Sequence, residues 1–394
     1  MKVAILGAGP AGLYLAYLLK RRRPETQVRL VEQNRADSTF GFGVVFSDRA
    51  LEFLKDDDAG TYDAIAPHLE VWRDIAIVHR GERIAIDGVG FGAVGRLQLL
   101  AVLQQRARSV GVEPEYARRI ERIEELVGAD LIVGADGANS LVRQSLAPEL
   151  GAGVSHLGNW FAWFGTTKRF ETLTQTFRTA EFGYCNAHHY RYADDMSTFI
   201  VELDAASFER AGFGQMREAA AKQICERVFA EDLGGHPLVS NRSIWRQFPN
   251  VRNERWSCDK CVLIGDALHT AHFSIGSGTR LAMEDAIALD RALARHPRDL
   301  GEALPSFEAS RRPILEKLVA AADRSARWYE RFPEHMALEP IDLAMSYVMR
   351  SGRIDLGRLR RLSPRFVARY ERERRKTSEA VVRGPERSEG TRDP

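Results

Sequence analysis

Apolar residues at the start of the chain follow a strand–helix–strand pattern. Residues 3–6 form a short apolar run that ends in turn residues, as expected for a buried parallel strand. Residues 13–20 carry leucines at helical spacing, and residues 28–32 form a second strand. This order predicts a βαβ unit. The glycines that interrupt the first apolar stretch argue against a signal peptide.

Farther along, the apolar pattern alternates between strand and helix periods. Residues 69–91 alternate apolar and polar positions around Arg80-Gly81-Glu82, which predicts a β-hairpin. Residues 158–203 are rich in Trp, Phe, Tyr and Thr, which is typical of antiparallel sheet. The remaining predicted elements are short strands at 130–134 and 261–265, and helices at 97–110, 215–231, 279–295 and beyond 305.

These elements predict an α/β fold in which a doubly wound, dinucleotide-binding domain is interleaved with an antiparallel-sheet substrate domain, plus C-terminal helices. We assign residues 1–66, 92–150 and 255–304 to the first domain and residues 67–91 and 151–254 to the second. Residues 305–376 form the predicted C-terminal helical region. Residues 377–394 form a predicted disordered tail, because they contain few apolar side chains.

Composition narrows the class of protein. With 44% hydrophobic and 28% charged residues, the 394-residue chain resembles ordinary globular proteins. Basic and acidic residues nearly cancel, 56 − 54 = +2, which argues against a nucleic-acid partner. No apolar run is long enough to span a membrane, and the four cysteines fit a reducing cytoplasm. We therefore expect a cytoplasmic monomer or homodimer.

The glycine pattern after the first strand predicts dinucleotide binding. Gly7 permits a tight turn, Gly9 lets the backbone approach a pyrophosphate, and Gly12 packs the helix against the strand. The helix N-terminus supplies amide donors for the anion. Glu32 follows at the end of the second strand, where a carboxylate binds ribose hydroxyls.

Two later motifs place aspartates at the carboxyl ends of predicted parallel strands, where α/β folds bind ligands. Asp136 stands in a Gly-Ala-Asp-Gly turn, and Asp266 follows Gly265 at the end of the second strand. Gly276 and Gly278 then open the helix at 279–295 and offer backbone amides to the same ligand. Read singly, each aspartate is more often an ordinary turn residue.

Taken together and in this order, the three motifs resemble the single-component flavoprotein aromatic hydroxylases, of which the para-hydroxybenzoate hydroxylase group is the best known. The resemblance covers roughly residues 1–330. It implies FAD as the bound cofactor, NADH or NADPH as a transient reductant, and dioxygen as co-substrate. The implied reaction is ring hydroxylation through a flavin hydroperoxide. Arg96 matches the arginine that this family aims at the flavin, although a plain helix-start arginine is an equal alternative.

Other segments are similar to one branch of this family. Leu268 replaces the family's alanine, and residues 271–274 lack its proline. Residues 272–278, together with 163–166 and 197–202, look like the branch that acts on coenzyme A thioesters. The resemblance implies an aryl-CoA substrate such as salicylyl-CoA, converted to gentisyl-CoA. The alternatives are an indole-type intermediate, as in violacein synthesis, a non-oxygenating flavin reductase, and a non-catalytic flavoprotein.

Candidate catalytic residues lie in the antiparallel segment. In a strand, period-two alternation puts His188 and Tyr190 on one face and His189 on the other. A histidine facing the flavin would bind a phenol and remove its proton. We select His188, because the thioester branch has a histidine there, with Tyr190 and His272 as further candidates. Satisfied core aromatics are the alternative interpretation. The aromatic residues predicted to keep the site dry are Trp160, Phe161, Trp163, Phe164 and Phe273.

Two other features carry less weight. Cys258 and Cys261 form a C-x-x-C pair, but no second spaced pair completes four zinc ligands, so we expect no metal. Residues 350–376 hold eleven basic and three acidic side chains. Such a segment either meets the phosphates of coenzyme A or a nucleic acid, or forms a solvated face, which we favour.

Overall fold

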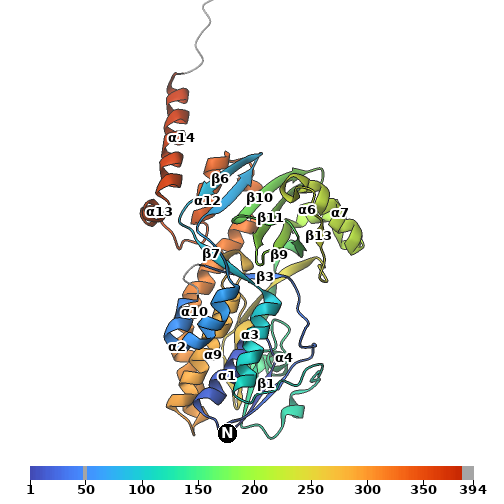
Figure 1. Ribbon diagram of the computed structural model, residues 1–394, viewed down its shortest axis with the longest axis vertical. Coiled ribbons are helices and arrows are strands. Elements are labelled where there is room, and N and C mark those ends of the chain that lie inside the picture. Colours follow the sequence, from blue (N-terminus) through green and yellow to red (C-terminus); the bar gives the residue numbers. More distant parts are fainter. Residues whose placement is uncertain (48–50, 384–394) are drawn as a thin grey trace, which may run out of the picture.

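Three β-sheets and the helices around them build the structure, a computed structural model that describes residues 1–47 and 51–383 (Figure 1). The first sheet has five strands in the order β15-β16-β8-β1-β2. Strands β16, β8, β1 and β2 are parallel, and β15 is antiparallel to β16. Its strands are β1 (Lys2–Leu6), β2 (Gln27–Val31), β8 (Leu131–Gly134), β15 (Ser257–Cys258) and β16 (Cys261–Leu263).

Long helices pack on this sheet and on one another. Helix α1 (Pro10–Arg22) starts with a proline, whose fixed φ suits the first helical position and whose missing N–H is not needed there. It ends in basic residues, which suit the negative end of the helix dipole. Its leucines are buried between the sheet and helices α3 (Arg96–Ser109) and α9 (Gly278–Arg295). The predicted βαβ unit and the helices at 97–110 and 279–295 are therefore confirmed to within a few residues.

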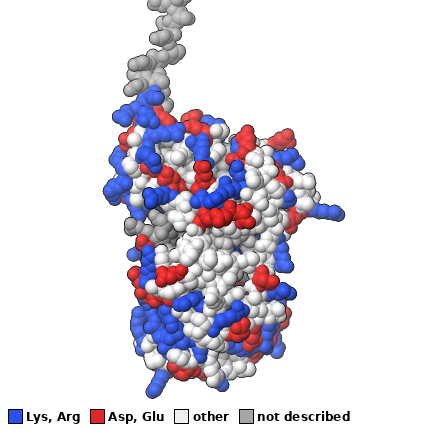
Figure 2. All heavy atoms as spheres, viewed as in Figure 1, with Lys and Arg blue, Asp and Glu red and all other residues white. Residues whose placement is uncertain are grey.

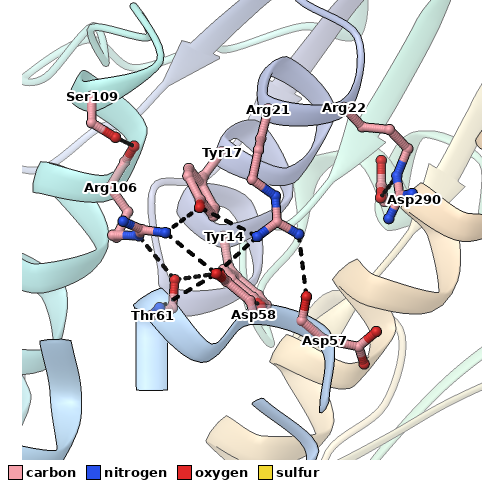
Figure 3. A network of polar contacts seen from close by, with 10 residues as sticks. All are labelled: Tyr14, Tyr17, Arg21, Arg22, Asp57, Asp58, Thr61, Arg106, Ser109 and Asp290. Atoms are coloured by element: carbon pink, nitrogen blue, oxygen red, sulfur yellow. Dashed lines mark hydrogen bonds and ion pairs between the residues drawn. The ribbon is translucent and has the colours of Figure 1, made fainter. Parts of the chain in front are cut away.

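A polar network fastens α2 (Glu52–Ile65) to α1 and α3 (Figure 3). Asp58 is buried and pairs with Arg21 at 2.8 Å and with Arg106 at 3.3 Å. Its carboxylate also accepts the Thr61 hydroxyl, while Arg106 donates to the Tyr17 hydroxyl. Because Asp58 interrupts the helical backbone with φ −157°, it marks a kink in α2 that the paired arginines hold in place.

The second sheet has eight strands in the order β13-β9-β12-β11-β10-β5-β6, with β14 also paired to β9. Neighbours are antiparallel, except that β10 and β5 run parallel. The predicted hairpin is β5–β6, turned by Arg80 and Gly81 at φ 50° and 79°. The strands are β5 (Ile75–His79), β6 (Glu82–Ile86), β9 (Ala152–Thr166), β10 (Leu173–Ala180), β11 (Gly183–Arg191), β12 (Ser197–Leu203), β13 (Leu238–Val239) and β14 (Arg246–Asn253).

Both faces of the eight-stranded sheet are covered. One face packs its apolar side chains against α6 (Ala205–Ala211), α7 (Glu218–Val228) and α8 (Ala230–Leu233). The opposite face packs against the end of α10 (Leu300–Glu330) and against α12 (Pro340–Met349). Two-sided burial explains why β12 is buried at every position and shows no alternation of exposure.

A small third sheet connects the two larger ones in Figure 1. It consists of β3 (Gly43–Ser47), β7 (Phe91–Gly95) and β4 (Glu70–Trp72), in the order β3-β7-β4. The sequence analysis did not predict it, because the strands are short and two of them contain glycines, which have low strand propensity.

The C-terminal part is helical, as predicted. After α10 come α11 (Phe332–His335), α12, α13 (Leu356–Leu362) and α14 (Pro364–Arg383), which projects from the body (Figure 1). Two predictions need correction. The expected helix 215–231 is divided into α7 and α8 by Phe229, whose backbone leaves the helical region. Residues 377–383, expected to be disordered, continue α14, and the rest of the predicted tail lies outside the described residues.

Part of the basic C-terminal segment pairs with acidic neighbours. Among the described residues, four of its eleven basic side chains form ion pairs, namely Arg360, Arg365, Arg369 and Arg374. Figure 2 shows Lys and Arg gathered around α13 and the base of α14, with acidic side chains among them. The pairs include Arg360–Glu371, Arg369–Glu82 and Arg374–Asp342. Arg350 instead points inward and donates to Ser325 and to the carbonyl oxygen of Ser274. These contacts favour the solvated-face interpretation over a phosphate-binding surface.

Two kinds of feature are absent from the described residues. Among residues 1–47 and 51–383, no helix combines the length and apolarity needed to cross a membrane. In the same residues, no group of three or more His, Cys, Asp or Glu side chains is arranged to hold a metal ion. Cys258 and Cys261 are free thiols, and they stand opposite each other as register partners of β15 and β16.

Candidate active site

Two adjoining cavities lie where the sheets meet. The first, of about 510 Å³, opens at the carboxyl ends of β1, β2 and β8. The second, of about 540 Å³, extends from there to β11 and β14 of the eight-stranded sheet. They share wall residues, namely Gly9, Pro10, Arg96, Ala135, Gly137 and Asn139. The two cavities therefore form one continuous site that extends from the parallel strands to the eight-stranded sheet.

The three glycines of the β1–α1 turn have different surroundings. Gly7 has φ +100°, and a Cβ there would lie 2.3 Å from the Ala135 carbonyl oxygen. A Cβ at Gly12 would lie 1.9 Å from the Gly7 carbonyl oxygen, so only glycine lets α1 approach β1 this closely. A Cβ at Gly9 would meet nothing within 4 Å, because this position borders the open cavities. The predicted approach of a pyrophosphate to Gly9 would use this free space, and it stays a prediction.

Glu32 lies in the wall of the first cavity, directly after β2. Its Oε1 accepts the backbone and side-chain amides of Asn34 at 2.8 and 2.7 Å. Its Oε2 accepts the Ala8 amide at 2.9 Å and retains a lone pair for a ribose hydroxyl. The carboxylate is thus held by the glycine turn itself.

The two turn aspartates face different parts of the site. Asp136 borders the first cavity, where its Oδ2 accepts the Leu141 amide at 2.7 Å and so caps the start of α4 (Leu141–Ser145). Its buried Oδ1 has no partner among the described residues, and burial raises the pKa of this carboxyl group. Asp266 borders the second cavity and is open to it, although it lies deep in the fold. Burial also raises the pKa of Asp266, while His269 and Arg96 oppose the shift.

A buried ionic cluster positions the turn that carries Asp266. Asp285 accepts the Gly265 amide at 3.0 Å, contacts His269 Nε2 at 2.7 Å and accepts Arg311 Nε at 2.8 Å. Burial alone would raise the pKa of Asp285, but the contacts with His269 and Arg311 lower it overall. The histidine of the Gly-Asp-Ala-x-His motif therefore supports the loop and does not line either cavity.

Arg96 and two glycines complete the predicted cofactor contacts. Arg96 begins α3 and lines both cavities, and its guanidinium makes no hydrogen bond or ion pair within the described part of the chain. Burial lowers its pKa, which Asp266 partly offsets. A Cβ at Gly276, which has φ +60°, would lie 3.0 Å from Val45 Cγ1, whereas one at Gly278 would meet nothing. Gly278 therefore leaves open space at the N-terminus of α9.

His188 lines the second cavity from β11 and is fully buried. Neither of its ring nitrogens has a hydrogen-bond partner among the described residues. Burial lowers the pKa of His188 to about 3, with a further contribution from the Arg350 guanidinium. His189 faces the other side of the sheet, where it contacts Thr176 and stacks on Phe199, as the alternation predicted. A neutral imidazole in the cavity is therefore available to a ligand.

The other two catalytic candidates are committed to protein contacts. Tyr190 lines the cavity, but its hydroxyl donates to the Gly43 carbonyl at 3.0 Å, and burial raises its pKa. His272 lies behind the wall, where Nδ1 contacts the Ser274 hydroxyl at 2.9 Å and the ring packs on Phe273. Burial, followed by Arg350, lowers its pKa to about 3. Of the three candidates, His188 alone combines a cavity position with unpartnered ring nitrogens.

Of the five aromatic residues predicted to exclude water from the site, three line the second cavity. Phe161, Trp163 and Phe273 line the second cavity. Trp160 instead stacks on Phe208 of α6 at 4.3 Å, and Phe164 is in the core beneath α6 and α7. Successive side chains of β9 point to opposite faces, so these two residues are directed away from the cavity.

The structure adds two residues that the sequence analysis missed. Arg246 of β14 lines the second cavity, half-buried and without an ion-pair or hydrogen-bond partner in the described residues. Glu202 of β12 is fully buried behind the cavity, and burial raises its pKa to about 8. Local pattern identifies neither of them, because their surroundings come from segments distant in sequence.

The residues of this site fit FAD. The open space at Gly9, the unpartnered Arg96 guanidinium and the free Asp136 oxygen border the continuous cavity on the dinucleotide side. The second cavity adds Asp266 and open space at Gly278, next to aromatic walls. The first cavity therefore suits the phosphate-bearing half of the cofactor, and the second suits a flat, hydrogen-bonding ring system.

Known proteins support the same conclusion. A family model described as an FAD binding domain matches residues 1–125 and 98–322. A salicyloyl-CoA 5-hydroxylase of Streptomyces sp is 41% identical over 94% of this chain and 73% of its own length. A 3-hydroxy-4-methyl-anthranilyl-[aryl-carrier protein] 5-monooxygenase of Streptosporangium sibiricum is 35% identical over 85% of this chain and 90% of its own. The protodeoxyviolaceinate monooxygenase of Chromobacterium violaceum is 34% identical over 88% of this chain and 94% of its own.

Solved structures agree with the fold. A probable FAD-dependent monooxygenase from Pseudomonas aeruginosa superimposes with a TM-score of 0.65 over 86% of this chain and 98% of its own, at 21% identity. The α/β architecture predicted from the sequence is thereby confirmed. The chain belongs to the FAD-binding-domain family and is an FAD-dependent aromatic monooxygenase that uses a reduced nicotinamide co-substrate.

Proposed function

We propose that this chain hydroxylates the ring of an aryl-coenzyme A thioester, with salicylyl-CoA as the first candidate, gentisyl-CoA as its product and 2-aminobenzoyl-CoA as the second candidate. The observation that carries the proposal is the unpartnered His188 imidazole in an aromatic-walled cavity that adjoins the dinucleotide site. The relative acting on salicyloyl-CoA supports this choice. A second relative is named for an aryl group attached to a carrier protein, which supports a substrate ring that is attached to a larger carrier.

Each part of the site contributes a separate function. FAD, when bound, supplies the reduction and activation of dioxygen. Phe161, Trp163 and Phe273 exclude water from the place where the ring and the flavin meet. His188 binds the phenolic hydroxyl and holds the ring in one orientation. Arg246 supports the thioester assignment, because an unpaired guanidinium in the cavity wall attracts a phosphate group.

His188 does not store a proton in this proposal. Its pKa of about 3 means that the ring is neutral at physiological pH. A second positive charge next to Arg350 would be costly in a buried site. The imidazole therefore accepts a hydrogen bond from the phenol and transmits the proton without itself carrying a positive charge.

Stopped-flow measurement of flavin reduction by NADH and by NADPH tests the substrate class. Salicylate, salicylyl-CoA and an indole substrate are compared at equal concentration. We expect the thioester to accelerate reduction most, because its nucleotide end adds binding energy that the free acid lacks. Equal stimulation by salicylate or by the indole would contradict the coenzyme A assignment.

The 34% identity to a monooxygenase of the violacein pathway favours one alternative, an indole-type substrate. Strong stimulation by the indole alone would select it. A flavin reductase that does not oxygenate is distinguished by product analysis under ¹⁸O₂. Incorporation of one labelled oxygen atom into the product supports the hydroxylase, and label-free product contradicts it.

A further inference from the structure

Four buried polar side chains form a patch on the cavity-facing side of the eight-stranded sheet. Gln175 is the register partner of His188, and Asn186 is the register partner of Glu202. Asn186 and His188 are two residues apart on β11 and share a face. Register partners have Cβ atoms about 4.5–5.5 Å apart, so the four side chains are neighbours. We call Gln175, Asn186, His188 and Glu202 the polar patch.

The polar patch contains six buried atoms that have no hydrogen-bond partner among the described residues. They are Gln175 Oε1, both side-chain atoms of Asn186, both ring nitrogens of His188, and Glu202 Oε2. Native proteins pair nearly all such atoms with protein or with ordered water. A contiguous set of six is therefore a place for bound water and for a ligand group. Only His188 among the four borders the cavity, so the other three extend the site inward.

Glu202 lies at the inner end of the polar patch. Its Oε1 accepts Asn159 Nδ2 at 2.8 Å, and Oε2 is free. Tyr329 and the half-buried Glu330 of α10 are the ionisable groups that face it from the helix, and Glu330 accepts the Gly158 and Asn159 amides of β9. Burial, followed by the nearby Glu330, raises the pKa of Glu202 to about 8. Glu202 is thus the buried carboxylate next to the cavity whose basicity approaches that of a phenol.

We infer that Glu202 is the acceptor of the substrate's phenolic proton, which reaches it through His188 and water bound at Asn186. The inference rests on the proposed function, because it requires a phenolic ring at His188. In the transfer the phenol O–H bond breaks and one imidazole nitrogen gains the proton. The other nitrogen releases its proton, and an O–H bond forms on Glu202 Oε2. The imidazole ends neutral in its other tautomer, the carboxylate becomes a carboxylic acid, and the substrate becomes a phenolate.

The charges of the site are consistent with this path. The transfer moves one negative charge from Glu202 to the substrate and creates no imidazolium. The Arg350 guanidinium, which lowers the pKa values of His188 and His272, has no carboxylate partner in the described chain and favours negative charge nearby. Glu202 is ionised above its pKa and protonated below it, so its capacity to accept a proton increases as the pH rises through about 8.

The test is a pH-jump experiment on oxidised holoenzyme with bound salicylyl-CoA, in which phenolate absorbance is followed after a step from below to above the pKa of Glu202. Glu202→Gln should slow phenolate formation by roughly a hundredfold, the usual lower range of a general base. Because glutamine mimics the protonated acid, the variant should fold, retain FAD and reach the same final amount of phenolate. The wild-type hydroxylation rate should rise with pH through about 8, and the variant should lack this rise.

Two further variants make the result specific. Asn186→Leu keeps the carboxylate but removes the polar group between it and His188, and should also slow phenolate formation. Glu226→Gln, the same change in α7 where Glu226 contacts Lys222, should leave the rate unchanged. A wild-type rate in Glu202→Gln overturns the inference and leaves the proposed function intact. Failure of salicylyl-CoA to bind wild-type holoenzyme overturns the proposed function, and the inference with it.

Discussion

Single residues of the site were predictable where a local period determines their direction. The two-residue period of β11 separates His188 from His189, and the structure places them on opposite faces. The same period, applied to β9, would have removed Trp160 and Phe164 from the predicted cavity wall. Arg246 and Glu202 were not predictable, because a polar atom without a partner is recognised only when all its neighbours are known.

Gly9 is the position at which a side chain would compete with the cofactor. Replacing it by Trp should abolish FAD retention, because the indole would fill the open space that borders both cavities. The flavin absorbance of the purified protein measures this. Gly153→Trp, at an exposed position of β9 outside both cavities, should retain FAD. Full flavin content in Gly9→Trp would show that the pyrophosphate lies elsewhere.

His188→Ala should preserve the fold and FAD but lose most of the coupling between NADH consumption and hydroxylation. Removing a proton-transferring group costs roughly a hundredfold or more in the step it serves. The ratio of hydroxylated product to hydrogen peroxide measures coupling. His189→Ala is the matched control on the opposite face, where stability should fall and coupling should persist. Equal coupling in wild type and His188→Ala would exclude His188.

Arg246→Gln tests whether the unpaired guanidinium meets a phosphate. A charge-assisted hydrogen bond contributes about 1.5–3 kcal/mol, so KM for salicylyl-CoA should rise by about tenfold or more. Salicylyl-pantetheine lacks the phosphates and should show the same KM with both proteins. If KM rises for NADPH and not for salicylyl-CoA, Arg246 contacts the reductant instead. Unchanged KM values for both nucleotides would contradict a phosphate contact.

At the level of elements, long periodic segments were predicted and short or glycine-containing ones were not. The βαβ unit, the hairpin and helices α3 and α9 follow from strong local patterns. Strands β3, β4 and β7 form only because distant segments meet, and their glycines weaken the local signal. The kink of α2 at Asp58 could not be predicted from the local sequence either, since Asp58 pairs with arginines of two other helices.

Asp58→Ala should destabilise the packing of α1, α2 and α3. Breaking a buried ion pair costs about 3–5 kcal/mol, and because Arg21 and Arg106 are partly exposed and rehydrate, we expect about 3 kcal/mol. Urea unfolding followed by tyrosine and tryptophan fluorescence measures the loss. Glu121→Ala removes an exposed ion pair with Arg119 and should change stability by less than about 0.5 kcal/mol. Equal stability of wild type and Asp58→Ala would mean that the cluster in Figure 3 is not structural.

For the whole molecule, the sequence predicted that distant segments share one fold, but the position of the site between sheets required the structure. The parallel sheet collects strands from residues 2–31, 131–134 and 257–263, in agreement with a discontinuous domain. The assigned domain boundaries remain a prediction. The cavity walls come from both large sheets, so a cofactor and a substrate bound there would contact both halves.

Removal of FAD should therefore loosen both halves of the molecule. A ligand at 100 times its Kd stabilises the folded state by about 2.7 kcal/mol, which for a chain of 394 residues predicts a drop in Tm of about 3 °C on preparing apoprotein. Added FAD should restore Tm in a concentration-dependent manner, and Gly9→Trp apoprotein should not respond. Hydrogen exchange should show that FAD protects both the β1–α1 turn and β11, because both border the continuous cavity. Protection confined to the parallel sheet would mean that the cofactor does not reach the eight-stranded sheet, and would contradict the placement of the flavin beside His188.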